Sequence, residues 1–259
     1  MAFNPYIARG RSAYRNISGA QLLRTAALPD DAAFTACGWA VLDVDTNAFS
    51  SIITLESGTA SAANGLYLET EADGTTLEIV ATGTGASLQL RAEVVGRPFF
   101  WALVSSGTAA GTTRGHTRRL WERAFTTAEF SVARTAFVPA ALFLGNSSFG
   151  ESLDGRLWGV RVWDAALTAH ELMVESLSSV PVRLRQLHGW WPLEGGFNQL
   201  IADRSGNGKL LTRTSGRVAP FFLPNSVLSP LPMRQAIMAA AAAGGGGRYA
   251  HRQILSGVG

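Results

Sequence analysis

Hydrophobic and polar residues alternate with a period of two along much of the chain. Between Gly65 and Gly74, Leu66 and Leu68 fall on one side, whereas Tyr67 and Glu69 fall on the other. Successive side chains of a β-strand point to opposite faces of the sheet, so this pattern predicts a strand with one buried face. The Asp73-Gly74 pair that follows is a hairpin signal.

Further strands are predicted wherever short apolar runs stand between turn residues. These are Phe34–Leu42, Phe49–Leu55, Leu77–Ala81, Leu88–Val95, Phe99–Val104, Arg118–Phe125 and Arg156–Trp163, with a loop over residues 105–118. The last strand carries large apolar residues on both faces, as in Trp158 and Trp163. It is therefore expected to be covered on both sides. Apolar residues also lie on both faces of Phe34–Leu42.

A short helix is predicted after Trp163. Asp164 is expected to cap it, and the spacing of Thr168 and Glu171 matches a capping box, in which each side chain bonds to the backbone of the other residue. Pro181 ends the helical stretch.

The chain resembles the laminin-G-like, concanavalin A-like domain superfamily in two places. The stretch LFLGNSSFGESLDGRLWGVRVWDAALTAHEL (142–172) is similar to the closing strands of such domains, and GWWPL (189–193) with ADRSGNG (202–208) to their opening signature. The resemblance implies an all-β, concanavalin A-like jelly-roll β-sandwich with one short helix. Functions in this superfamily range from sugar binding to glycan hydrolysis to protein contacts, so the fold does not choose among them.

The turn within the second stretch has a physical basis of its own. Gly206 and Gly208 permit left-handed backbone angles, and Asp203 and Ser205 are expected to bond the backbone of the turn.

Charge is distributed unevenly along the chain. Residues 1–24 contain four arginines and no acid, and residues 225–259 contain three arginines and no acid, which leaves about −4 for the region between them out of a total of +3. We therefore divide the chain into an N-terminal arm (1–28), a β-sandwich (29–224) and an Ala/Gly-rich C-terminal arm (225–259). Basic arms on an acidic body suggest docking on neighbouring subunits. The candidate contact residues are Tyr6, Arg9, Arg11, Tyr14, Arg15, Arg234, Arg248, Tyr249 and Arg252.

Composition narrows the choice of function. A hydrophobic content of 47% suffices for a packed core, and no apolar run approaches the roughly 20 residues of a membrane span. The first residues lack the apolar region of a secretory signal, and the single cysteine, Cys37, is expected to be a buried apolar side chain. A nucleophile elbow, a zinc-binding HExxH motif and a cysteine–histidine metal cluster are all missing from the sequence. We expect neither catalytic residues nor a cofactor or metal.

Three features of the sequence are candidates for catalysis or ligand binding. Glu69, Glu71 and Asp73 share the outward face of one strand at separations near those used by glycosidases, but the E-x-E-x-D order departs from the E-x-D-x-x-E string of glycan-cleaving relatives. A solvated strand face is the simpler interpretation. The stretch 43–47 imitates the start of a calcium loop but has the wrong residues at the positions that matter, which favours an acidic turn over a calcium site.

Tyr67 and Trp121 are the candidates for stacking a sugar, if they are exposed. Trp121 could also stack a base, but one aromatic in a basic strand is weak support, so nucleic acid is not expected as a partner. A packed or interfacial Trp121 is the alternative.

The sequence thus favours a non-enzymatic structural protein of a virus particle, either a bacteriophage capsid decoration or a tail component. Its partners would be other copies of itself and other virion structural proteins. We do not expect it to bind a membrane. The alternative is a carbohydrate-binding module on a tail fibre or a cell surface, with a glycan as partner.

Overall fold

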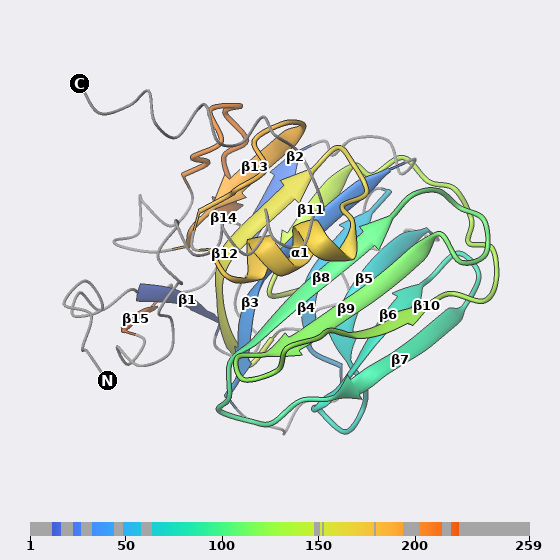
Figure 1. Cartoon of the computed structure of the whole chain (residues 1–259), viewed down its shortest axis with the longest axis horizontal. Helices are drawn as coiled ribbons and strands as arrows, with labels where there is room; N and C mark the ends of the chain where they lie inside the picture. The colour runs from blue at the N-terminus through green and yellow to red at the C-terminus, as the bar shows by residue number, and fades with distance from the viewer. Residues whose placement is uncertain are drawn as a thin grey trace, which may run out of the picture.

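The chain forms two antiparallel β-sheets packed face to face, with one short helix (Figure 1). The computed structural model describes residues 12–16, 23–26, 33–43, 49–57, 64–147, 151, 153–178, 180–193, 202–213 and 219–222. Within this part of the chain, no helix is long and apolar enough to cross a membrane.

The eight-stranded sheet is organised around two long central strands. Its order is β10 (Thr126–Glu129), β9 (Thr113–Arg119), β8 (Phe99–Ser105), β3 (Phe34–Leu42), β12 (Gly155–Trp163), β1 (Ser12–Asn16) and β15 (Ala219–Phe222), and β13 (Leu187–Trp191) also pairs with β12. All nine residues of β3 are buried, and so are eight of the nine in β12. The prediction that these strands are covered on both faces is confirmed.

The seven-stranded sheet is a meander joined to strands from distant parts of the chain. Its order is β14 (Thr212–Arg213), β2 (Leu23–Ala26), β11 (Ala141–Leu144), β4 (Ser51–Glu56), β5 (Gly65–Thr70), β6 (Thr76–Ala81) and β7 (Ala86–Ala92). Gly74 in the β5–β6 turn has a φ of 70°, as the Asp-Gly hairpin signal predicted.

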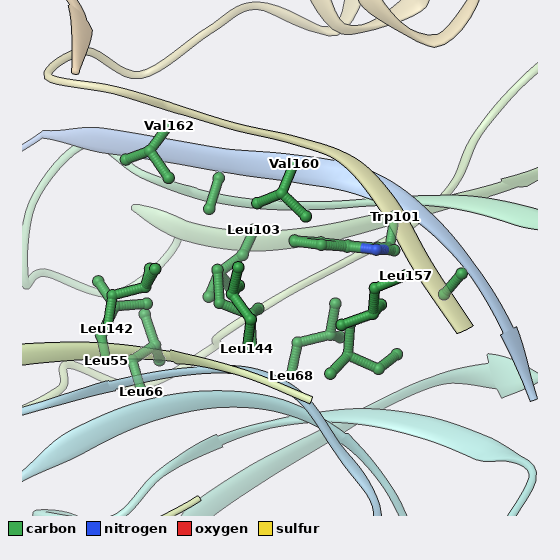
Figure 2. Packing of buried hydrophobic residues seen from close by; sticks show 14 of the residues in the cluster. Leu55, Leu66, Leu68, Trp101, Leu103, Leu142, Leu144, Leu157, Val160 and Val162 are labelled. Carbon is green, nitrogen blue, oxygen red and sulfur yellow. The ribbon is translucent and has the colours of Figure 1, made fainter. Parts of the chain in front are cut away.

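The main core lies between the two sheets. Figure 2 shows Leu66 and Leu68 of β5 facing side chains of the opposite sheet, among them Trp101 and Val160. The alternation in β5 therefore has the predicted sense, with the leucines inward. Burial of these side chains stabilises the sandwich by roughly 25 cal/mol for each Å² of apolar surface removed from water.

A second apolar cluster covers the outer face of the eight-stranded sheet. Helix α1 (Ala169–Ser176) lies over this face (Figure 1), and its Leu172 packs in a cluster with Trp39, Trp158 and Trp163. The rings of Trp39 and Trp158 stack with centroids 6.2 Å apart. Cys37 belongs to the same cluster and is fully buried, as expected, and burial raises the pKa of its thiol.

Helix α1 begins as the sequence predicts but with a different cap. Thr168 is the N-cap, and its capping box with Glu171 is complete. Asp164 does not cap the helix; its carboxylate lies 2.8 Å from Nδ1 of His188. The prediction for Asp164 is wrong because three residues lie between it and Thr168, which directly precedes the first helical turn.

Part of the predicted N-terminal arm belongs to the sandwich. β1 pairs with β12 and β15, and β2 pairs with β11 and β14, so residues 1–28 supply one strand to each sheet. Tyr14 and Arg15 lie in β1. The remaining arm candidates, Tyr6, Arg9, Arg11, Arg234, Arg248, Tyr249 and Arg252, are outside the described residues. Assignment of the arms to partner contacts stays a prediction.

The region before Trp121 differs from the prediction. Residues 105–118 were expected to form a loop, but β9 runs from Thr113 to Arg119 between β8 and β10. Gly115 explains why its sequence does not resemble a strand. A Cβ at this position would lie 2.5 Å from Cδ1 of Ile79 and 2.8 Å from Cδ1 of Leu90, so a larger residue here would make side chains of the facing sheet shift.

Candidate functional site

Trp121 occupies a turn at one end of the sandwich. β9 ends at Arg119, the chain turns at residues 120–121, and β10 begins at Thr126. The side chain of Trp121 is 59% exposed, and Leu120 beside it is also exposed. The prediction of a strand through Trp121 is wrong, and the turn is what places the indole in solvent. Tryptophan is enriched at contact sites because its ring joins a large apolar body to a polar N–H group, so an indole held in solvent marks a candidate contact site.

Ion pairs on either side hold this turn in place. Glu122, which follows Trp121, accepts hydrogen bonds from both terminal nitrogens of Arg91, at 3.0 and 2.8 Å, and from the backbone N–H of Arg119 at 2.8 Å. Glu93 accepts a bond from Nε of Arg119 at 2.9 Å and lies 3.0 Å from Nε of Arg91. The four side chains form a closed network between β7 and the turn.

The carbonyl of Glu122 adds a further restraint. It accepts a hydrogen bond of 2.8 Å from the buried Arg118. Charged hydrogen bonds from several directions fix the backbone on both sides of Trp121. The indole is therefore presented on a preorganised turn, so little conformational entropy has to be lost when a ligand stacks on it.

The second stacking candidate, Tyr67, is not exposed. It lies on the outward side of β5, as the alternation predicts, but only 2% of it is accessible. A Cβ on Gly65 would lie 2.8 Å from Oη of Tyr67, which shows that the ring lies flat along its own strand. Burial and the nearby carboxyl group of Glu56 raise the pKa of Tyr67. The prediction that Tyr67 offers an exposed aromatic surface is wrong.

Tyr67 lies among several carboxyl groups, which we call the acidic face. It covers the outer side of β4, β5 and β6 and the segment after β11, and its members are Glu56, Glu69, Glu71, Glu78 and Glu151. Glu69 and Glu78 stand directly opposite one another in neighbouring strands. Like charges in that position are destabilising when both are ionised.

Glu69 and Glu151 form the centre of the acidic face. Oε2 of Glu69 lies 3.2 Å and Oε2 of Glu151 3.3 Å from the single hydroxyl of Ser51. Ser147 donates a second hydrogen bond, of 2.8 Å, to Glu151. Burial, together with the charge of Glu151, raises the pKa of Glu69 to about 8. Glu69 therefore favours its protonated form near neutral pH.

The three acidic residues predicted to share a strand face have separate environments. Glu69 is buried and Glu71 is half-buried, whereas Asp73 is exposed and accepts hydrogen bonds from the backbone N–H groups of Thr75 and Thr76. These bonds lower the pKa of Asp73 and fix the turn. The proximity of Glu151 to Glu69 could not be predicted from the sequence, because Glu69 lies in β5 and Glu151 in a segment after β11, far along the chain.

Among the residues that the structure describes, no group of three or more His, Cys, Asp or Glu side chains is arranged to hold a metal ion. Most of the imitated calcium loop, residues 44–48, lies outside the described residues. Asp43 is described and forms an ion pair with Arg156 at 2.5 Å.

The Asp203 turn has the predicted geometry. Oδ1 of Asp203 accepts from the backbone N–H groups of Ser205 and Trp190, and Oδ2 accepts from the N–H of Lys209. The φ angles of Gly206 and Gly208 are 90° and 68°. The turn thus anchors β13 and serves the fold.

Comparison with known proteins supports the fold. No protein-family model matches the chain, and no curated protein is similar enough in sequence to count as a relative. Among solved structures, a candidate carbohydrate-binding protein from Bacteroides ovatus ATCC 8483 has a TM-score of 0.59 at 14% identity, covering 86% of this chain and 62% of that protein.

Two further structures are similar over much of the chain. The SAP-like pentraxin of Limulus polyphemus has a TM-score of 0.53 at 16% identity and covers 85% of this chain and 97% of its own. Tailspike protein 2 of an Escherichia coli O157:H7 bacteriophage has a TM-score of 0.51 at 16% identity, over 66% of this chain and 25% of the tailspike. The chain thus spans less than two thirds of the Bacteroides protein and a quarter of the tailspike.

These similarities concern the fold. The neighbours are jelly-roll β-sandwiches, which confirms the predicted all-β fold class and is consistent with a concanavalin A-like domain. The narrower resemblance to laminin-G domains stays a prediction, as does the boundary at residue 224.

Proposed function

We propose that the chain is a non-enzymatic, carbohydrate-binding β-sandwich module of a virion tail protein, and that Trp121 is its stacking platform. The observation that carries the proposal is the 59% exposure of Trp121 on a turn fixed by the Arg91–Glu122 and Arg119–Glu93 ion pairs. Sugar rings present apolar C–H faces, and an indole held in solvent by a rigid backbone is the natural surface for them.

The carboxyl pair on the acidic face supports a non-catalytic role. Glycosidases hold their two carboxyl groups about 5–5.5 Å or 6.5–9.5 Å apart, which leaves room for the sugar or for water. Glu69 and Glu151 instead bond to the same hydroxyl of Ser51, and Glu69 is only 5% exposed. At this exposure Glu69 has almost no surface on which a substrate could act.

The virion setting has separate support. The same fold occurs in part of a phage tailspike. In addition, residues 1–24 and 225–259 contain arginines but no aspartate or glutamate. Docking of these segments on other copies or on other virion proteins is the assembly role that we propose, and a tail location fits a glycan-binding module better than capsid decoration does.

Replacing Trp121 with alanine is expected to weaken glycan binding by at least about tenfold, because truncating a tryptophan that anchors a binding interface typically costs about 2 kcal/mol or more. A glycan array would first identify ligands of the wild-type protein. Isothermal titration calorimetry with the best ligand would then compare the wild type with Trp121→Ala.

The matched control is Phe49→Ala, which removes the other large exposed aromatic side chain of the described residues, 40% accessible and two residues before β4. It should leave affinity unchanged. Equal binding by Trp121→Ala and the wild type, or an array without any ligand, would overturn the proposal.

A further inference from the structure

Arginine side chains are concentrated around Trp121. In the β8–β9 ladder Phe99 pairs with Arg119. Arg97 lies two residues before Phe99 and Trp121 two residues after Arg119, so both lie beyond the same end of this ladder. Segments 91–97 and 118–123 together contain five arginines and two glutamates, a net charge of +3.

These arginines fall into two groups. Arg91 and Arg119 are neutralised by Glu93 and Glu122 in the network that holds the turn. Arg97 and Arg123 are exposed and, within the part of the chain that the structure describes, pair with no carboxylate. The first pair is structural, whereas the second leaves two guanidinium groups available to a ligand.

We call the exposed side chains of Trp121, Arg97 and Arg123 the Trp121 surface. We propose that this surface selects glycans that carry a carboxylate, with the sugar ring on the indole and the acid group on Arg97 or Arg123. This inference rests on the function proposed above and adds the class of ligand. A guanidinium group matches a carboxylate with two parallel hydrogen bonds, and it is more weakly hydrated than an ammonium group. The exposed side chains of Val94 and Val95 add apolar surface at the same end of the sandwich.

The arrangement favours an acidic sugar over a nucleic acid. Proteins that bind single strands without sequence preference usually offer several aromatic platforms along a basic groove. Here Trp121 is the one large aromatic side chain exposed at this end among the described residues. A single ring with two nearby cations suits one charged sugar unit.

The test compares binding of an oligogalacturonate with that of a neutral malto-oligosaccharide of the same length. The variant Arg97→Gln/Arg123→Gln should lose at least about tenfold in affinity for the oligogalacturonate, since hydrogen bonds to charged groups are among the stronger ones. Its affinity for a neutral ligand should stay the same. Raising the salt concentration should weaken binding of the acidic ligand and leave binding of the neutral ligand unchanged.

The control variant Arg185→Gln/Arg204→Gln removes the same amount of charge from two exposed arginines beside β13. Strands β8, β3 and β12 separate that region from β9. This variant should bind the oligogalacturonate like the wild type.

Two results would overturn the inference without touching the proposed function: a neutral glycan bound through Trp121 as tightly as the acidic one, or equal losses in the two double variants. Tighter binding of an oligothymidylate of matched charge would overturn it in favour of nucleic acid. If no saccharide binds and Trp121→Ala changes nothing, the proposed function itself fails.

Discussion

Replacing Arg161 with methionine is expected to lower the free energy of unfolding by about 3–5 kcal/mol, the usual cost of breaking a buried ion pair by removing one partner. Arg161 of β12 and Glu175 of helix α1 are each 1% exposed at their side chains, and Nη1 lies 2.7 Å from Oε2 of Glu175. The same guanidinium group donates to the backbone carbonyls of Glu175 and Ser178.

The loss has two physical components. The carboxyl group of Glu175 would remain buried without its counter-charge, and burial already raises its pKa. The carbonyls at the C-terminal end of α1 would also lose their donor, since the last carbonyls of a helix have no partner within it. Arg118, which donates to the carbonyl of Ser176, cannot replace these bonds.

Urea denaturation followed by circular dichroism would measure the effect. Addition of Glu175→Gln to Arg161→Met should recover part of the lost stability, because the amide removes the buried charge and its oxygen can still accept from the N–H groups of Val182 and Arg183. The exposed Arg185→Met serves as control and should change little. A loss below about 1 kcal/mol in Arg161→Met would contradict this account.

The stability of the protein is expected to fall as the pH rises from about 6.5 to 8.5, and Glu69→Gln should remove much of this fall. The pKa of Glu69 is raised from 4.5 to about 8, so between these values the folded state holds a proton that the unfolded state has released. Stability therefore decreases with rising pH through this window and levels off above it. The total change is on the order of a few kcal/mol.

The choice of window matters because His116 has the opposite effect at lower pH. Burial lowers the pKa of His116 from 6.5 to about 4, so its contribution to stability is lost as the pH falls through that range. This contribution levels off about one pH unit above 6.5, and the difference between the wild type and Glu69→Gln then reports on Glu69.

Thermal melts at half-unit pH steps would measure both proteins. Glutamine keeps the shape of a protonated carboxyl group and can still bond to Ser51, so Glu69→Gln should be more stable than the wild type at pH 8.5. Glu129→Gln, at an exposed salt bridge with Arg114, is the control and should follow the wild-type curve. Parallel curves for the wild type and Glu69→Gln would show that the pKa of Glu69 is not raised in the folded protein.

Features governed by neighbours in the sequence could be predicted without the structure. The capping box of Thr168 and Glu171, the turn around Asp203 and the hairpin at Gly74 each depend on bonds that span a few residues. Alternation likewise predicted that Leu66 and Leu68 face the core, since the pleat of a strand fixes the direction of successive side chains.

The candidate site depended on contacts between distant segments. Trp121 could be picked out by residue type, but its exposure follows from the turn after β9 and from the bonds of Glu122 to Arg91 on β7. Tyr67 has the same outward direction in its strand as the sequence indicated, yet its ring lies over Gly65 and is buried.

By itself, the sequence determined the fold class, the face that β5 turns to the core, the capping box of Thr168 and Glu171, and the turns at Gly74 and Asp203. The tertiary structure alone decided which aromatic side chain is exposed, that Glu69 shares Ser51 with Glu151, and that residues 12–16 and 23–26 are strands of the sandwich. The physical reason is that periodicity fixes a side chain's direction along its own strand, whereas exposure and protonation depend on what the rest of the chain places above it.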